Sequence, residues 1–231
     1  MTDDKFQELA KLLDILFKNI ALIRQAFIHR SYLNETKVKT YSNERLEFLG
    51  DSILSFLVSE YLYKKYPEFS EGELTNLRSS IVKTATLAQA AKELNLGNFL
   101  LVSKGEEESG GRKNNSLLAD TFEAFLGAVY LDVGLPSVQK ILKNLLFPLL
   151  TKILEDKLYK DAKSNFQELI QENTKISPMY KVLSEKGPDH AKEFTIGVFA
   201  NDKLWGTGTG KSKQEGEMKA AQAALENWAK K

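Results

Sequence analysis

Over the first two thirds of the chain, hydrophobic residues recur three and four positions apart, which is the spacing of one face of an α-helix. The first such stripe runs from Phe6 to Phe17. The polar, glycine-containing stretch 103–115 is expected to be an exposed, mobile loop. The pattern therefore predicts an all-α domain over 1–155. Its further helices are expected over 22–33, 43–64, 73–95, 116–131 and 135–154.

The pattern changes near residue 160. One more helix is expected over 164–172, and alternating segments then predict three strands, with turn residues between them. A last amphipathic helix is expected over 212–229. The order α-β-β-β-α predicts a small α+β domain over 161–231, joined to the first by a short charged linker over 156–160. The strands are expected over 179–184, 193–200 and 203–207.

Composition narrows the possible chemistry. The chain has 231 residues, no Cys and two His, which excludes disulfides, thiolate metal sites, a cysteine nucleophile and a histidine-rich zinc site. The acidic N-terminus does not resemble an export signal, and the apolar runs are far shorter than the roughly 20 residues that span a bilayer. We therefore expect a cytoplasmic protein without a membrane partner. The net charge of +1 would by itself lower the odds of a nucleic-acid partner, although total charge does not reveal placement.

Acidic residues share a face in two otherwise apolar helices. Glu44, Glu47 and Asp51 lie three and four residues apart, in a helix that Ser42 or Asn43 can cap, and a second helix carries Asp120 and Glu123. Together the helices could present four carboxylates to one point, a donor set that suits Mg²⁺ or Mn²⁺ and phosphodiester hydrolysis. Spacing alone leaves a second interpretation open, in which these acids form solvated helix faces.

Before the last helix, a run of glycines leads into Lys211, Ser212 and Lys213. Backbone N–H groups, the helix dipole and two lysines would make this helix start an anion site. A nucleotide-binding P-loop is excluded because Trp205 stands where that motif needs glycine, so no nucleotide cofactor is expected. A simple basic helix end and a flexible glycine turn remain alternatives. His29 is expected to support a helix rather than to bind a metal.

Several motifs resemble those of known families. The segment Asn43–Ser52 (NERLEFLGDS) resembles the hallmark of the ribonuclease III family, and the chain around it carries further motifs in the family's order. The tail resembles the double-stranded-RNA-binding domain. The resemblance implies an all-α endonuclease domain followed by a small α+β double-stranded-RNA-binding domain. The supporting motifs are His29–Tyr32, Glu71–Leu74 and Asp120–Ala124 in the first part, and Phe166–Leu169, Gly187–His190 and Gly210–Lys213 in the tail.

The resemblance also implies an activity. It is that of an endoribonuclease that cuts double-stranded RNA with Mg²⁺, or with Mn²⁺ as a substitute, and leaves 5′-phosphate and 3′-hydroxyl ends. Such an enzyme would process ribosomal RNA precursors and other structured transcripts. A homodimer is implied as well, with Phe48 packing across the interface. The acids that match the family's metal ligands are Glu47, Asp51, Asp120 and Glu123, of which Asp51 and Glu123 are the chief catalytic candidates, while Glu44 and Glu71 match secondary acids.

In the tail, the resemblance assigns the RNA contacts. Gln167 and Glu168 match minor-groove contacts of the first helix, and His190 matches the loop that enters the next minor groove. Lys211 and Lys213 match the phosphate clamp across the major groove. The two departures from the family pattern are Gln214, which removes one expected phosphate contact, and Gly216, which should weaken its helix by up to about 1 kcal/mol.

A non-catalytic RNA-binding protein or RNA chaperone is the rival hypothesis. In that case the helical domain would serve only as a dimeriser, and converging acids would have no purpose. A helical scaffold with an unrelated charge pattern would leave the tail unexplained.

Overall fold

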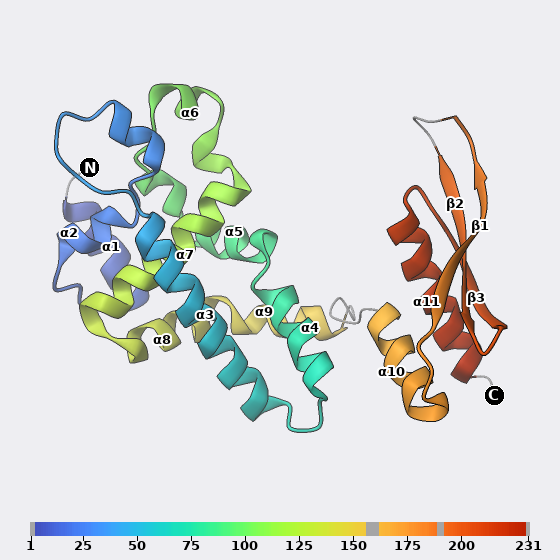
Figure 1. The fold of residues 1–231 in the computed structure, drawn as a ribbon. Helices are drawn as coiled ribbons and strands as arrows, with labels where there is room; N and C mark the ends of the chain where they lie inside the picture. Colours follow the sequence, from blue (N-terminus) through green and yellow to red (C-terminus); the bar gives the residue numbers. More distant parts are fainter. Residues whose placement is uncertain (1–2, 156–161, 189–191, 230–231) are drawn as a thin grey trace. The chain divides into compact units, whose positions relative to one another are not determined.

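The structure is a computed structural model that describes residues 3–155, 162–188 and 192–229 (Figure 1). It divides into two compact units, Met1–Tyr159 and Lys160–Lys231, and each is described by itself. The expected linker over 156–160 lies outside the described residues.

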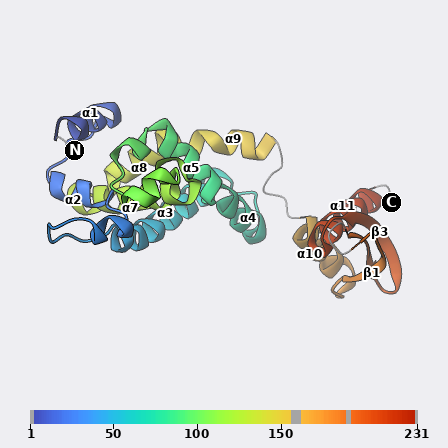
Figure 2. The same ribbon diagram turned by 90° about the horizontal axis from the view of Figure 1, so that it is seen from above.

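The first unit is all-α, as predicted. Its longest helices are α3 and α7, which lie side by side in Figures 1 and 2 and form the centre of the unit. The elements are α1 (Asp3–Leu13), α2 (Ile20–Gln25), η1 (Arg30–Asn34), α3 (Glu44–Lys65), α4 (Glu71–Ile81), α5 (Thr84–Glu93), η2 (Leu96–Phe99), α6 (Lys104–Glu108), η3 (Gly111–Lys113), α7 (Asn115–Val133), α8 (Leu135–Leu145) and α9 (Phe147–Glu155).

Three predicted helices divide in the structure. The segment 22–33 forms the end of α2 and most of η1, with 26–29 between them outside any helix. The segment 73–95 forms α4 and α5, and Thr86 at their junction donates its hydroxyl to the Ser80 carbonyl (3.2 Å). The segment 135–154 forms α8 and α9. None of these three divisions was predicted.

The stretch 103–115 was wrongly predicted to be a loop throughout. It contains the short helices α6 and η3. The Ser103 hydroxyl accepts the Glu106 N–H (3.2 Å) and so caps α6. The Arg112 guanidinium binds the Glu107 carboxylate and the carbonyls of Gly97 and Leu100. These bonds hold the segment against η2.

Backbone contact brings α3 and α7 unusually close together. A Cβ atom on Gly50 of α3 would lie 1.8 Å from the Glu123 carbonyl oxygen, and one on Gly127 of α7 would lie 2.3 Å from the Leu46 carbonyl oxygen. Only glycine fits at these two points. Each helix also places buried residues along one side of its length, with Leu54 of α3 fully inside the core. The crossing therefore fixes which turns of the two helices face each other.

The second unit confirms the predicted order α-β-β-β-α. Its strands form one antiparallel sheet in the order β1-β2-β3, and Phe166 and Ile196 lie in its core. The elements are α10 (Ala162–Thr174), β1 (Met179–Lys186), β2 (Glu193–Ala200), β3 (Lys203–Gly210) and α11 (Lys213–Ala229).

The glycines before α11 belong to a strand rather than to a flexible turn. Gly206 and Gly208 lie in β3, where a Cβ would come within 2.5 Å of the Ala220 carbonyl oxygen and 2.2 Å of the Ala220 nitrogen, respectively. They let α11 pack directly on the strand. Gly216 is buried in α11, and a Cβ there would lie 2.7 Å from Ile196 Cγ1. This glycine therefore serves close packing, which offsets part of its cost to the helix.

Within the described ranges, no helix combines the length and the apolar character that crossing a membrane would require.

Candidate active site and RNA-binding surface

Three of the predicted acids come together where α3 crosses α7. Glu47 comes from the first turn of α3, and Asp120 and Glu123 lie one turn apart on α7. Each offers one carboxylate oxygen, and the three oxygens lie within 4.8 Å of one another. All three side chains are half-buried. Three hard oxygen donors at this spacing fit a divalent cation of the Mg²⁺ or Mn²⁺ class.

The acids are costly to ionise without a cation. Burial, followed by the charges of Asp51, Glu47 and Asp120, raises the pKa of Glu123 to about 8. Burial also raises the pKa of Glu47, with Asp120, Glu44 and Asp51 adding to the effect. Burial raises the pKa of Asp120, while the nearby His29 opposes the shift. A bound divalent cation would stabilise the charged carboxylates against both their burial and the repulsion of their acidic neighbours.

Asp51 and the two secondary acids lie outside this three-oxygen set among the described residues. Asp51 is exposed one turn after Glu47, and its charge is the largest electrostatic contribution to the raised pKa of Glu123. The Glu44 carboxylate accepts the Ser42 hydroxyl (2.7 Å). Glu71 is exposed at the start of α4.

Two residues beside the site, His29 and Asn43, were predicted to support or cap helices. His29 supports a helix, as predicted, because its Nδ1 accepts the Ser31 N–H (3.3 Å) at the start of η1. Asn43, one of the two residues predicted to cap α3, occupies its N-cap position, but its side chain makes no capping hydrogen bond. The contact at Gly50 and Gly127 was missed as well. Glycines in the middle of apolar helices were the available signal for it.

The predicted RNA contacts on α10 and at the start of α11 are exposed. Gln167 and Glu168 lie on the outer face of α10, and Lys211 and Lys213 flank the first turn of α11. His190 lies outside the described residues.

The start of α11 is a capped helix end. The Ser212 hydroxyl accepts the Glu215 N–H (3.2 Å), and the Glu215 carboxylate accepts the Lys211 N–H (2.8 Å). Hydrogen bonds from Lys219 and from the Lys211 backbone lower the pKa of Glu215. Lys213 Nζ lies 3.7 Å from Glu185, an exposed pair of little energetic weight. The cap fixes the backbone on both sides of Ser212, and with it the points from which the Lys211 and Lys213 side chains project.

Two family models match the chain, one in each unit. Residues 19–150 match the model described as Ribonuclease-III-like, and residues 162–227 match the double-stranded RNA binding motif. The chain belongs to the ribonuclease III family. It is an endoribonuclease that acts on double-stranded RNA, with a nuclease domain followed by a double-stranded-RNA-binding domain.

Relatives resemble the ribonuclease III chain over most of its length. Ribonuclease 3 of Bacillus velezensis is 47% identical over 223 residues, covering 96% of this chain and 89% of the relative. Ribonuclease 3 of Geobacillus kaustophilus is 48% identical over 225 residues, covering 96% and 90%. A solved structure of the nuclease domain of ribonuclease III from Campylobacter jejuni has a TM-score of 0.56 and 39% identity. It covers 61% of this chain and 94% of that one, and its description refers to a flexible region involved in dimer formation.

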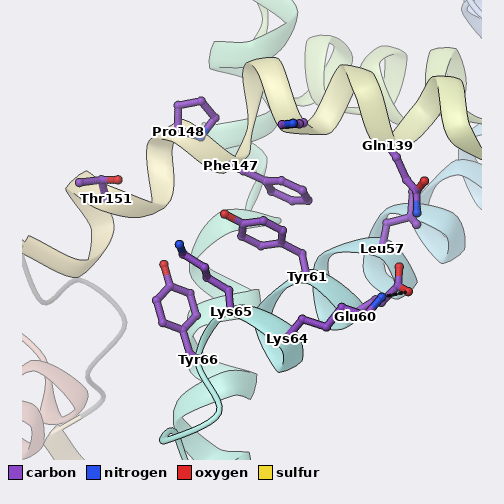
Figure 3. A pocket seen from close by; sticks show the side chains of 11 residues that line it. Leu57, Glu60, Tyr61, Lys64, Lys65, Tyr66, Gln139, Phe147, Pro148 and Thr151 are labelled. Atoms are coloured by element: carbon purple, nitrogen blue, oxygen red, sulfur yellow. Dashed lines mark hydrogen bonds and ion pairs between the residues drawn. The ribbon is translucent and has the colours of Figure 1, made fainter.

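A cavity of about 550 Å³ lies at the other end of α3, against α8 and α9 (Figure 3). The Tyr61 ring stacks on Phe147 there, with 3.8 Å between ring centroids. Leu57 of the cavity follows Glu47 by ten residues, or about 15 Å along the helix axis. The cavity is therefore separate from the acids of the ribonuclease III site.

Proposed function

We propose that this ribonuclease III cuts double-stranded RNA by Mg²⁺-dependent hydrolysis, leaving 5′-phosphate and 3′-hydroxyl ends, and that Mn²⁺ can replace Mg²⁺. The convergence of Glu47, Asp120 and Glu123 carries this proposal, because three clustered acids with raised pKa values suit a cation and gain nothing from a purely RNA-binding role. When bound, the cation supplies activation of water and neutralisation of charge on the phosphate.

The acids take different roles in this proposal. Glu47, Asp120 and Glu123 hold the cation together with Asp51, whose exposed carboxylate lies on the substrate side. The raised pKa leaves Glu123 largely protonated at neutral pH in the metal-free protein, so it releases its proton when the cation binds. Asp51 and Glu123 are the catalytic acids, and Glu44 and Glu71 position RNA or water around them.

The second domain holds the duplex. Gln167, Glu168 and His190 contact minor grooves, and Lys211 and Lys213 bind phosphates across the major groove. Recognition of this kind follows A-form shape and 2′-hydroxyls rather than sequence. The helices of ribosomal RNA precursors and other structured transcripts are therefore suitable substrates, and we propose that the enzyme acts in their processing.

Cleavage of a long RNA duplex by the full-length protein tests the proposal. We expect cutting with Mg²⁺ or Mn²⁺, no cutting with EDTA, and a loss of at least about 10³-fold in Glu123→Gln, because the cation loses a ligand. End-labelled products should carry 5′-phosphate and 3′-hydroxyl groups. Tight duplex binding without cutting under any divalent ion would instead support the RNA chaperone.

The proposed phosphate clamp predicts a change in salt dependence. In EDTA, the double variant Lys211→Gln/Lys213→Gln should reduce the slope of log binding constant against log salt by about 2, because two phosphate contacts are lost. The matched double variant Lys181→Gln/Lys203→Gln, on β1 and β3, should leave the slope unchanged. A similar slope in both double variants would contradict the clamp. Gln214→Lys should raise the affinity and steepen the slope by about 1.

We also propose a homodimer formed through α3. Phe48, Phe56 and Tyr63 are 78, 57 and 74% exposed on this helix, a stripe of aromatic surface that is costly to leave in water. In sedimentation equilibrium, Phe56→Glu should raise the dimer dissociation constant at least about 100-fold, since a two-fold interface contains each change twice. Leu16→Glu, at an apolar residue outside α3 that is 76% exposed, should leave the dimer intact. Equal dissociation constants in the two variants would refute this interface.

A further inference from the structure

We infer that Asn43 is a positioning residue of the active site. Its buried amide ties the first turn of α3, where Glu47 lies, to the segment 26–29. The inference rests on the proposed function, because it concerns the site that holds the cation. Asn43 is not a catalytic residue and does not contact the three-oxygen set. Its effect is exerted through the position of Glu47.

The Asn43 side chain is committed to a distant carbonyl. It is only 3% exposed, and its Nδ2 donates to the Ala26 carbonyl (3.3 Å), seventeen residues earlier in the chain. The Asn43 N–H donates to the Ile28 carbonyl (2.8 Å). Side chain and backbone of one residue therefore bind two carbonyls of the same segment, which holds that segment in both position and direction.

The carbonyl of Asn43 acts on the other side of this connection. It accepts the N–H groups of Leu46 (2.8 Å) and Glu47 (2.9 Å), and so begins the helix that carries the acids. The neighbouring Ser42 carbonyl accepts Gln25 Nε2 (3.2 Å), which adds a second link to α2. A shift of Asn43 would therefore move the first turn of α3 and the Glu47 carboxylate with it.

The segment 26–29 is itself held on its far side. The Leu101 N–H donates to the Phe27 carbonyl (2.8 Å), and the His29 N–H donates to the Leu101 carbonyl (3.0 Å). His29 Nδ1 also accepts the Ser31 N–H (3.3 Å), and the Ser31 hydroxyl accepts the Ser103 N–H (3.0 Å). The segment to which Asn43 ties the first turn of α3 is therefore itself fixed in place.

Two substitutions separate this role from helix capping. Serine and aspartate are both good N-caps, but neither can donate the amide N–H that reaches the Ala26 carbonyl. A capping role predicts that Asn43→Ser and Asn43→Asp retain function. A positioning role predicts that both lose it, and in Asn43→Asp this loss would occur despite an added negative charge that should attract cations.

Thr86→Ala provides the matched control for loss of stability. Thr86 is also a buried polar residue whose side chain donates to a main-chain carbonyl, that of Ser80, at the junction of α4 and α5. All these variants are expected to melt below the wild type. Only the Asn43 variants should weaken Mn²⁺ binding, measured by calorimetry or electron paramagnetic resonance on the full-length protein.

We expect the Mn²⁺ dissociation constant to rise at least tenfold in Asn43→Ser and Asn43→Asp and to change less than twofold in Thr86→Ala. Hydrogen exchange of the Leu46 and Glu47 amides, measured without metal, should accelerate at least tenfold in the Asn43 variants alone. Wild-type Mn²⁺ affinity and exchange rates in Asn43→Ser would overturn the inference and leave the proposed function intact. Absence of metal binding by the wild type would instead remove the proposed function, together with the role of Asn43 within it.

Discussion

Replacing Gly50 with alanine should destabilise the nuclease unit by about 3 kcal/mol or more and reduce RNA cleavage at the same time. The added Cβ would lie 1.8 Å from the Glu123 carbonyl oxygen, so α3 and α7 must separate. Alanine is the better helix former by up to about 1 kcal/mol, so the expected loss must come from packing alone. Separation would also move Glu47 away from Glu123, because these acids lie on opposite sides of the contact.

Thermal unfolding of the full chain can show which of the two units loses stability. Both tryptophans, Trp205 and Trp228, belong to the second unit, so tryptophan fluorescence follows that unit while far-UV circular dichroism is dominated by the helical first unit. In Gly50→Ala the midpoint temperature of the circular dichroism transition should fall, while that of the fluorescence transition should not change.

The matched control is Gly105→Ala in α6. A Cβ on Gly105 meets no atom within 4 Å, so this variant should be neutral or slightly more stable. If Gly50→Ala is as stable and as active as Gly105→Ala, the helices do not cross in backbone contact as described.

The sequence was sufficient to predict which residues share a helix face, but not where two helices meet. Periodicity groups Glu47 with Asp51, and Asp120 with Glu123, because both pairs follow the helical repeat. That Glu47 rather than Asp51 joins the α7 pair depends on the crossing at Gly50, which is a tertiary contact. Local patterns do not contain that information.

Other differences have the same physical origin. Asn43 has the side chain of a good cap, yet its Nδ2 donates to the Ala26 carbonyl and its side chain accepts no N–H of the first turn. The division of the segment 73–95 follows no glycine or proline, so no local signal marked it. In the tail, alternation located all three strands, but only the packing of α11 on β3 explains why glycines recur there.

Without metal, the protein should become less stable as the pH rises from about 4.5 to 8. The pKa of Glu123 is near 4.5 when the chain is unfolded and about 8 when it is folded, so the folded state binds the extra proton throughout this window. Stability is therefore complete below the unfolded pKa and is lost as pH rises through the folded pKa. Allowing for partial exposure of the carboxyl, the loss should be about 2 kcal/mol.

Glu123→Gln should remove most of this pH dependence, because a neutral amide keeps the uncharged state at every pH. At pH 8 in EDTA the variant should then be more stable than the wild type, whereas at pH 4.5 the two should be similar. Chemical unfolding at several pH values, followed by circular dichroism, measures the difference, and Glu8→Gln on α1 serves as the exposed-acid control. Saturating Mg²⁺ should reverse the order at pH 8, since only the wild type keeps the full ligand set and gains binding free energy on folding. The contrary result would be a metal-free wild type whose stability follows that of the variant from pH 5 to 8. It would show that the pKa of Glu123 is not raised in the folded protein.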